Sequence, residues 1–281
     1  MKMKLLQASL IFLSLSLSAQ PVLKIKTDTI YRAPESVAFD SIRNVIYVSN
    51  YTAPVREGSY YGKHTVSKAD LEGNLIEADW ITGLTSPTGI CIHKDKLYIV
   101  ERFGVVEYDL AADTICNKYY IKTTDFLNDL ALDDEDNIYV TLSGTKIIYR
   151  ISHGIVEKWL EDDLIANPNG ILYDRGRLVV GSTDHSSLNF IDPVTREISP
   201  VAAFGEGVVD GIKACNDGYL VTVFGGQLFH VSESGELDEL INTKNKKLFL
   251  ADFEYIPSKE LIIVPALWNN RLLIYTYSED K

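Results

Sequence analysis

The sequence predicts an all-β fold, a six-bladed β-propeller, from a recurring phrase, its spacing and the apolar runs after each copy. The phrase is a small or polar pair that opens an apolar run, and it returns six times along the 281 residues. A turn and further short apolar runs come after each copy. A period near 40 residues in an all-strand sequence is typical of four-stranded blades stacked around an axis. The six copies open at Glu35, Thr88, Asn128, Asn169, Asp210 and Asp252, with separations of 53, 40, 41, 41 and 42 residues.

The first 19 residues carry a different pattern. Lys2 and Lys4 precede an apolar stretch over residues 5–17, and small residues end it at 16–19. This arrangement is typical of a secretory signal peptide, and the stretch is too short and too rich in serine for a membrane span. We therefore expect an exported protein, periplasmic or secreted, without a membrane anchor. Its mature chain, residues 20–281, is expected to form one propeller domain.

Each repeat supplies candidates for the four strands of a blade. The first strands are nearly continuous apolar runs, as expected where neighbouring blades cover both faces. Turns rich in Asp, Asn, Gly and Lys separate them from the second strands, predicted at 45–48, 97–100, 138–141, 178–180, 219–222 and 261–264. Third strands are predicted at 105–108, 147–150, 188–191 and 272–275, and more polar fourth strands at 74–77 and 155–158.

The last repeat runs out of chain after its third strand, at Tyr277. The segment 22–26 precedes the first repeat and has no other strand to pair with. We expect it to supply the missing outer strand of the last blade. Pairing the two ends of the chain would close the ring and hide an exposed edge.

The first blade departs from the pattern by an extra dozen residues at 51–63. By register this loop connects the second and third strands, on the face where the repeats open. Two interpretations stay open, a tolerated surface insertion and a lid over the channel mouth, because long loops in compact folds often bind ligands.

The net charge excludes some classes of binding partner, and the cysteine spacing excludes disulfide and metal-thiolate sites. The formal net charge is −12, and removal of Lys2 and Lys4 leaves 25 basic against 39 acidic residues, or −14. Nucleic acid and anionic membrane surfaces are therefore poor partners, whereas a cation suits the balance. The cysteines, Cys91, Cys116 and Cys215, show no disulfide or metal-thiolate spacing, and we interpret all three as small core residues.

The residues that open the repeats predict a metal site. Equivalent positions in a closed ring lie at equal heights, so these side chains are expected around the mouth of one channel. Carboxylates about 4 Å apart repel by roughly 4 kcal/mol at an effective dielectric constant near 20, and a cation relieves that repulsion. Carboxylate and amide oxygens suit Ca²⁺, with Mg²⁺, Mn²⁺ or Zn²⁺ as substitutes. The alternative is that these residues only satisfy inner-strand backbone groups or hold water, as we expect of Thr88 along the wall.

Four pieces of the chain also carry a resemblance. They are Pro34-Glu35, Asn128-Asp129, Pro168-Asn169-Gly170 and Asp210-Gly211. With them, the chain resembles the senescence marker protein/gluconolactonase/luciferin-regenerating-enzyme family of six-bladed propellers over essentially its whole mature length. The resemblance implies that Glu35, Asn169 and Asp210 ligate a catalytic divalent cation, with Asn128 beside it contacting metal or substrate.

The chain departs from that family at the third repeat. Gluconolactonases of the family often show R-F-N-D-G there, with the Arg touching the sugar acid, whereas this chain has Phe126-Leu127-Asn128-Asp129-Leu130. Arg102, in a loop of the neighbouring blade, is the candidate replacement. Phe126 and Trp268, together with Phe103 and Phe224, are expected to form an apolar rim for the substrate, so we expect a preference for less polar lactones or esters.

The resemblance implies an exported, metal-dependent hydrolase of lactones or related esters. Asp210 is the candidate for activating water or attacking directly, and Asn128 is expected to assist turnover. His185, on a loop at the same face, is either a general base or a solvated loop residue. The rival interpretation is a non-catalytic NHL-type propeller that binds a protein or small ligand. Such a scaffold has no need for oxygen side chains at consecutive strand openings, which favours the enzyme. The sequence does not set the oligomeric state.

Overall fold

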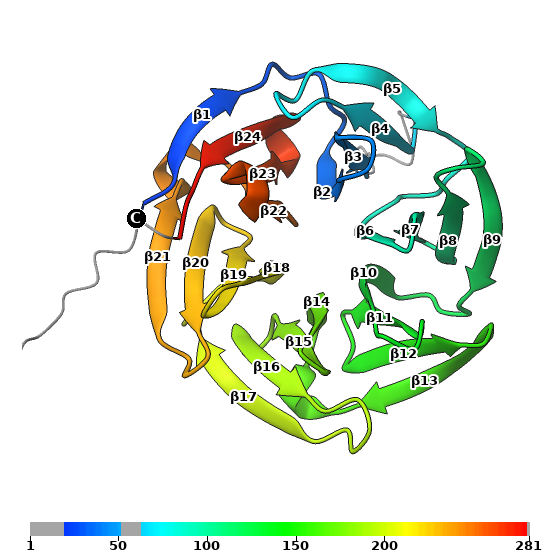
Figure 1. Cartoon of the computed structure of the whole chain (residues 1–281). Coiled ribbons are helices and arrows are strands. Elements are labelled where there is room, and N and C mark those ends of the chain that lie inside the picture. Colours follow the sequence, from blue (N-terminus) through cyan, green and yellow to red (C-terminus); the bar gives the residue numbers. More distant parts are fainter. Residues whose placement is uncertain (1–19, 52–62, 280–281) are drawn as a thin grey trace, which may run out of the picture.

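The computed structural model describes residues 20–51 and 63–279, which form six antiparallel sheets of four strands around one axis (Figure 1). The predicted six-bladed propeller is confirmed. The signal peptide predicted at 1–19 lies outside the described residues, as does most of the 51–63 insertion. The insertion does connect the second and third strands of its blade, because β3 ends at Asn50 and β4 begins at Thr65.

In the first five blades the strands run in chain order from the axis outwards, and in the sixth the N-terminal strand is outermost. The first blade comprises β2 (Pro34–Asp40), β3 (Val45–Asn50), β4 (Thr65–Ala69) and β5 (Leu75–Ile81). The second comprises β6 (Ile90–His93), β7 (Lys96–Glu101), β8 (Gly104–Asp109) and β9 (Thr114–Tyr120). The third comprises β10 (Phe126–Leu132), β11 (Ile138–Ser143), β12 (Ile147–Ser152) and β13 (Ile155–Glu161).

The remaining blades keep the same plan. The fourth comprises β14 (Pro168–Asp174), β15 (Arg177–Ser182), β16 (Ser187–Ile191) and β17 (Ile198–Ala203). The fifth comprises β18 (Val209–Cys215), β19 (Gly218–Val223), β20 (Gln227–Ser232) and β21 (Leu237–Asn242). The sixth comprises β22 (Glu254–Ile256), β23 (Leu261–Ala266), β24 (Arg271–Thr276) and β1 (Val22–Lys26). Short 3₁₀ turns lie at η1 (Asp163–Ile165), η2 (Lys244–Lys246), η3 (Pro257–Lys259) and η4 (Leu267–Asn269).

The N-terminal strand closes the ring, as predicted. β1 pairs antiparallel with β24, with Val22 opposite Thr276 and Lys26 opposite Leu273. In Figure 1 the blue β1 lies along the outside of the red β24. The sixth sheet therefore joins both ends of the chain and leaves no third-strand edge open.

The hydrophobic core lies between blades. Each of the six larger apolar clusters draws side chains from two neighbouring blades, and one such cluster joins Tyr47 of the first blade to Leu97 of the second. Both side chains are fully buried. Inner strands are therefore covered on both faces, which explains their continuous apolar runs.

The cysteines only partly match the expectation of core packing. Cys215 is buried, Cys91 is half-buried, and Cys116 is exposed on β9, so the prediction is wrong for Cys116. An outermost strand of a blade has one face in water, which is why Cys116 has no core to enter. Within the described ranges 20–51 and 63–279, no helix is long and apolar enough to cross a membrane.

Candidate metal centre

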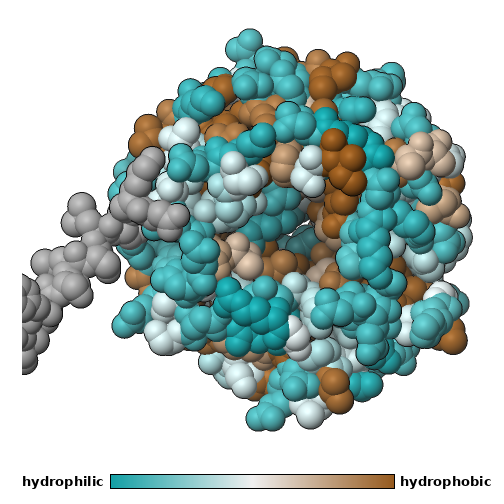
Figure 2. Space-filling model, viewed as in Figure 1, coloured by the Kyte–Doolittle hydropathy of each residue, from teal (hydrophilic) through white to brown (hydrophobic). Residues whose placement is uncertain are grey.

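Four of the predicted ring residues line one cavity at the axis. Glu35, Asn128, Asn169 and Asp210 share a cavity of about 420 Å³, with Thr88 on its wall. Each of the four is only 6–7 % exposed. They come from the first, third, fourth and fifth blades, and their strands are the innermost of each sheet (Figure 1). Figure 2 shows a hollow at the centre of the ring, bordered by both hydrophilic and hydrophobic residues.

A repeated backbone irregularity aims these side chains into the channel. On β2 the pairs Pro34–Asn50 and Val37–Val48 enclose two residues on the inner strand but only one on its partner. The same irregularity, a β-bulge, recurs on β10, β14 and β18. The first residue inside each bulge is the ring residue. Bulges re-aim a side chain at the end of a strand, so the fold itself turns these four residues to the axis.

Hydroxyl groups hold the bulges in place. The bulged backbone amides of Ser36, Asp129 and Gly211 donate to Ser49 Oγ (2.9 Å), Thr141 Oγ1 (3.0 Å) and Thr222 Oγ1 (2.8 Å), respectively. Thr141 Oγ1 in turn donates to the carbonyl of Asn169 in the next blade, at 2.7 Å. Each hydroxyl stands at the single residue opposite the bulge. Satisfying a bulged amide in this way avoids the cost of a buried, unpaired donor.

Asp252 is not part of the ring at the mouth, so the prediction that it faces the mouth is wrong. In the sixth blade Leu250 bridges to Ala266, as Pro34 bridges to Asn50 in the first. Ala251 therefore stands where Glu35 stands, and Asp252 falls one position further along, at the level of Ser36 and Asp129. Thr222 Oγ1 confirms the equivalence, because it donates to the Ala251 carbonyl at 3.0 Å as Thr141 does to that of Asn169.

Three oxygen atoms of the ring lack partners among the described residues. Glu35 Oε2, Asn128 Oδ1 and Asn169 Oδ1 are buried and make no hydrogen bond within this part of the chain. Thr88 differs, since its hydroxyl donates to the Leu127 carbonyl at 3.4 Å and only lines the wall, as expected. Three buried oxygens without donors are costly unless a ligand satisfies them. Two carboxylates and two amide oxygens form a donor set that fits Ca²⁺ or a similar hard cation.

The electrostatics of the ring point the same way. Burial raises the pKa of Glu35 well above its usual range, and the carboxylates of Asp210, Asp252 and Asp129 raise it further. Burial likewise raises the pKa of Asp210, with Asp252 and Asp129 adding to the effect. Both shifts mean that negative charge is disfavoured in the channel as it stands. A bound cation would reverse that preference.

A second charged cluster lies deeper in the channel than the ring, further along the inner strands from the mouth. Asp129, Asp252 and Glu254 face the ammonium of Lys213, whose Nζ lies 4.0 Å from Asp252 Oδ1. Ser36 Oγ donates to Asp252 Oδ2. Burial raises the pKa of Asp129 to about 8, with Asp252 adding to it and Lys213 opposing it. Among the described residues, the ring and this cluster together hold five carboxylates, including Glu35 and Asp210, against one ammonium.

Glycines give this cluster its room. A Cβ on Gly89 would meet Asp129 Oδ1, and one on Gly211 would meet Asp252 Oδ1. A Cβ on Gly170 would meet the carbonyl oxygen of Asp210. Each glycine directly follows a residue that opens a repeat. The inner strands of neighbouring blades therefore approach more closely than any side chain at these positions would allow.

The predicted substrate residues separate into two groups. Phe126, Phe224 and Trp268 line the cavity, whereas Arg102 and Phe103 are exposed and do not. His185 is also exposed and outside the cavity lining, and its Nε2 hydrogen-bonds the Asp163 carbonyl at 2.7 Å. The structure brings together the predicted ligands and the apolar rim, but it does not bring Arg102 or His185 to them.

Sequence reasoning missed Val208, Leu267 and the charged pair of Lys213 and Glu254. Lys213 had a signal, because it is the only charged residue at the fourth position of the first five repeat phrases, where other blades carry residues such as Ala38 and Cys91. In the corrected register of the sixth repeat, Glu254 takes the same position. Val208 and Leu267 lie in connections between strands, where no period marks a residue as lining.

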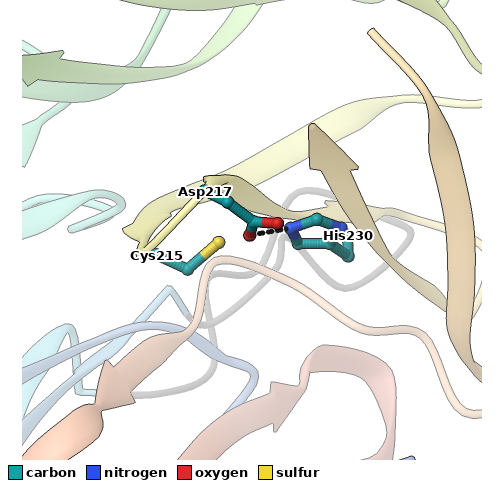
Figure 3. A group of neighbouring side chains, drawn as sticks. All are labelled: Cys215, Asp217 and His230. Atoms are coloured by element: carbon teal, nitrogen blue, oxygen red, sulfur yellow. Dashed lines mark hydrogen bonds and ion pairs between the residues drawn. The ribbon is translucent and has the colours of Figure 1, made fainter. Parts of the chain in front are cut away.

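A third group of side chains lies where the fifth blade turns from β18 to β19. The donor atoms of Cys215, Asp217 and His230 lie within 4.8 Å of one another (Figure 3). His230 Nε2 already bonds Asp217 Oδ1 at 2.9 Å, and burial, followed by Glu279 and Asp217, raises the pKa of the Cys215 thiol to about 12. This group is an imidazole–carboxylate pair beside a protonated thiol, at the opposite end of β18 from Asp210.

Comparison with solved structures finds chains of similar fold, two of which are described as gluconolactonases. A gluconolactonase from Xanthomonas campestris superposes with a TM-score of 0.70 at 14 % identity, over 92 % of this chain and 96 % of that one. A provisionally assigned gluconolactonase gives 0.69 at 12 %, over 92 % of both chains. Virginiamycin B lyase from Staphylococcus aureus gives 0.63 at 12 %, over 92 % of this chain and 98 % of that one.

At these identities the likeness shows the fold alone. It confirms the resemblance to gluconolactonase-like six-bladed propellers at that level. No protein-family profile and no curated protein matches the sequence.

Proposed function

We propose that this chain is an exported hydrolase of lactones or related esters that depends on a divalent cation, Ca²⁺ in the first place. The observation that carries the proposal is the set of three buried, partnerless oxygens of Glu35, Asn128 and Asn169 on the floor of an axial cavity, beside Asp210. Mg²⁺, Mn²⁺ and Zn²⁺ are the alternatives for the same oxygens. The likeness in fold to gluconolactonases supports the substrate class.

Each residue has a role in this proposal. Glu35, Asn169 and Asp210, with Asn128 beside them, hold the cation. A cation bound there supplies Lewis-acid polarisation of a substrate carbonyl. Hydrolysis joins a water oxygen to the carbonyl carbon and breaks the ring C–O bond. We assign the acceptance of the water proton to an Asp210 carboxylate oxygen, since His185 is already bonded to the Asp163 carbonyl. Asp210 returns that proton to the departing ring oxygen, which becomes the alcohol of the hydroxy-acid product.

A lyase activity has less support. In the structure of virginiamycin B lyase, a variant with one histidine replaced by alanine is catalytically inactive. Among the described residues that line the axial cavity here, none is a histidine. Proton abstraction by a histidine in the cavity therefore has no counterpart in this part of the chain, whereas hydrolysis needs only a cation, a carboxylate and water.

The test is metal analysis followed by activity. Purified mature protein is expected to retain or take up one equivalent of Ca²⁺ by calorimetry and to hydrolyse members of a lactone and aryl-ester panel, and chelator should abolish the activity. Asp210→Ala should abolish tight Ca²⁺ binding. Asp217→Asn is the control, a carboxylate of the fifth blade outside the cavity, and should leave binding unchanged. Binding of Ca²⁺ without any turnover would favour the non-catalytic propeller instead, and wild-type affinity in Asp210→Ala would contradict the ligand assignment.

A further inference from the structure

Polar and apolar residues are unevenly distributed around the cavity above the ring. Its oxygens come from the first, third, fourth and fifth blades, whereas the sixth blade contributes Leu267 and Trp268. Tyr51, Phe126, Val208 and Phe224 complete the walls. The sixth blade has no ligand to offer, because Ala251 occupies its ring position. The mouth therefore has a polar floor and an apolar wall.

The residues of the apolar wall pack against one another and against buried neighbours. Leu267 is buried with Ala33 and Ala251, and Tyr51 and Phe224 pack against these three. Tyr51 meets Phe126 edge-on, with ring centroids 5.8 Å apart. Phe224 lies beside Phe249, with centroids 5.6 Å apart. These contacts hold the aromatic faces in position before any ligand arrives, so little ordering is needed on binding.

Cationic side chains are missing from the described walls of the cavity. No lysine, arginine or histidine is among the described residues that line the cavity. The Thr88 hydroxyl is already committed to the Leu127 carbonyl. A polyhydroxylated sugar lactone would bury hydroxyls against Phe126, Phe224 and Trp268, which cannot hydrogen-bond them in that way. An anionic substrate would meet the carboxylates of the floor without a cationic side chain to hold it.

We propose that the substrate is an uncharged lactone or ester bearing an apolar aliphatic substituent, which lies along Phe126, Phe224 and Trp268. This inference rests on the proposed function, and it adds the class of substrate and the residues that select it. Burial of each added methylene against such a wall is expected to improve binding about fourfold until the wall is covered. Glucono-lactone is expected to be a poor substrate.

A lactone series tests this with Ca²⁺ saturating. The kcat/KM of wild type is expected to rise along γ-butyrolactone, γ-hexanolactone, γ-octanolactone and γ-decanolactone, and to be low for glucono-lactone. Trp268→Ala should flatten the rise, measured within each protein as the ratio of kcat/KM for γ-decanolactone to kcat/KM for γ-butyrolactone. Phe103→Ala is the matched control, because Phe103 is an aromatic residue of similar exposure (51 % against 49 % for Trp268) outside the cavity.

A binding series separates this inference from the hydrolase itself. The probes are 2-alkylcyclopentanones with propyl to heptyl chains, which are uncharged and cannot be hydrolysed, and affinity is measured by calorimetry. Affinity that grows with chain length in wild type but not in Trp268→Ala supports the apolar wall, even if no lactone is turned over and the proposed function fails. Hydrolysis with no dependence on chain length, or a clear preference for glucono-lactone, overturns the inference and leaves the hydrolase standing. Absence of chain-length dependence in both series also overturns it.

Discussion

Thr27 and Leu272 exchange hydrogen bonds across almost the entire chain. Thr27 N donates to the Leu272 carbonyl at 3.1 Å, and Leu272 N donates to Thr27 Oγ1 at 3.0 Å, 245 positions away. Thr27 is buried and directly follows β1. The contact pins the end of the closing strand to the start of β24, so the integrity of the ring depends on it.

The first prediction concerns this closure. Thr27→Val keeps the shape but leaves the Leu272 amide without its acceptor, so it should lower the free energy of unfolding by about 1–3 kcal/mol. Deletion of residues 20–28 should expose the edge of β24 and cause aggregation or a much larger loss of stability. Denaturant unfolding and light scattering measure both. A truncated monomer as stable as wild type would show that closure contributes nothing.

The second prediction is a change of sign at Asp210. Its raised pKa means that the ionised carboxylate destabilises the folded protein without a cation, so in chelator Asp210→Asn should be more stable than wild type, on the order of 1 kcal/mol. With Ca²⁺ at about 100 times its Kd, wild type should instead gain about 2.7 kcal/mol that the variant lacks. Thermal unfolding in both buffers, with Asp217→Asn as control, measures this. The same sign in both buffers would argue against a cation at Asp210.

The third prediction tests the hydroxyl that joins two blades at the ring. Thr141→Val removes the acceptor for the Asp129 amide and the donor to the Asn169 carbonyl, at a fully buried position. We expect a loss of about 1–3 kcal/mol in stability and weaker Ca²⁺ binding, since Asn128 and Asn169 flank the lost bonds. The exposed Thr195→Val should change neither by more than about 0.5 kcal/mol. Unchanged Ca²⁺ affinity by calorimetry in Thr141→Val would mean that the hydroxyl does not position the ligands.

The fourth prediction is a pH dependence at Asp40. Its carboxylate accepts hydrogen bonds from the amides of Ile42 and Arg43, the Arg43 guanidinium and the Tyr47 hydroxyl, all at 2.9 Å. Burial alone would raise the pKa of Asp40, but these bonds outweigh it and lower the pKa. Its contribution to stability is therefore present above the usual aspartate pKa and is lost as pH falls through the lowered value.

Accordingly, Asp40→Asn should cost on the order of 2 kcal/mol at pH 7. The difference from wild type should shrink in acid, below about pH 4, where the wild-type carboxylate becomes protonated. Urea unfolding at a series of pH values measures this, in the presence of chelator so that the ring does not contribute. A constant difference from pH 7 to pH 3 would be inconsistent with the lowered pKa.

The fold and most of the ring could be predicted from the sequence, because a propeller repeats its chemistry at a fixed period. Asn128, Asn169 and Asp210 are 41 residues apart, and one more step of 41 reaches Ala251. The phrase at Asp252 looked like a copy because it offered an acidic residue before an apolar run. The strand pairing, with Leu250 opposite Ala266, reveals the one-residue shift.

The other differences have a local physical origin. Arg102 and His185 were placed by loop register, which gives the face of the molecule but not the direction of a side chain. Lys213 escaped notice because the role of this half-buried lysine becomes clear once Asp129, Asp252 and Glu254 from other blades are seen around it. Contacts between blades join residues far apart in sequence, and a repeat pattern describes each blade by itself.

The close approach at Gly89, Gly170 and Gly211 divides the molecule into parts with different freedom to evolve. At the hub, any larger residue collides with the neighbouring strand, so the spacing of the ring residues is fixed by the backbone rather than by the side chains chosen around it. The rim is under no such restriction, because Phe126, Phe224 and Trp268 contact the cavity from strand ends and connections. New substrate ranges can thus arise by exchange of a few rim residues while the hub is inherited unchanged.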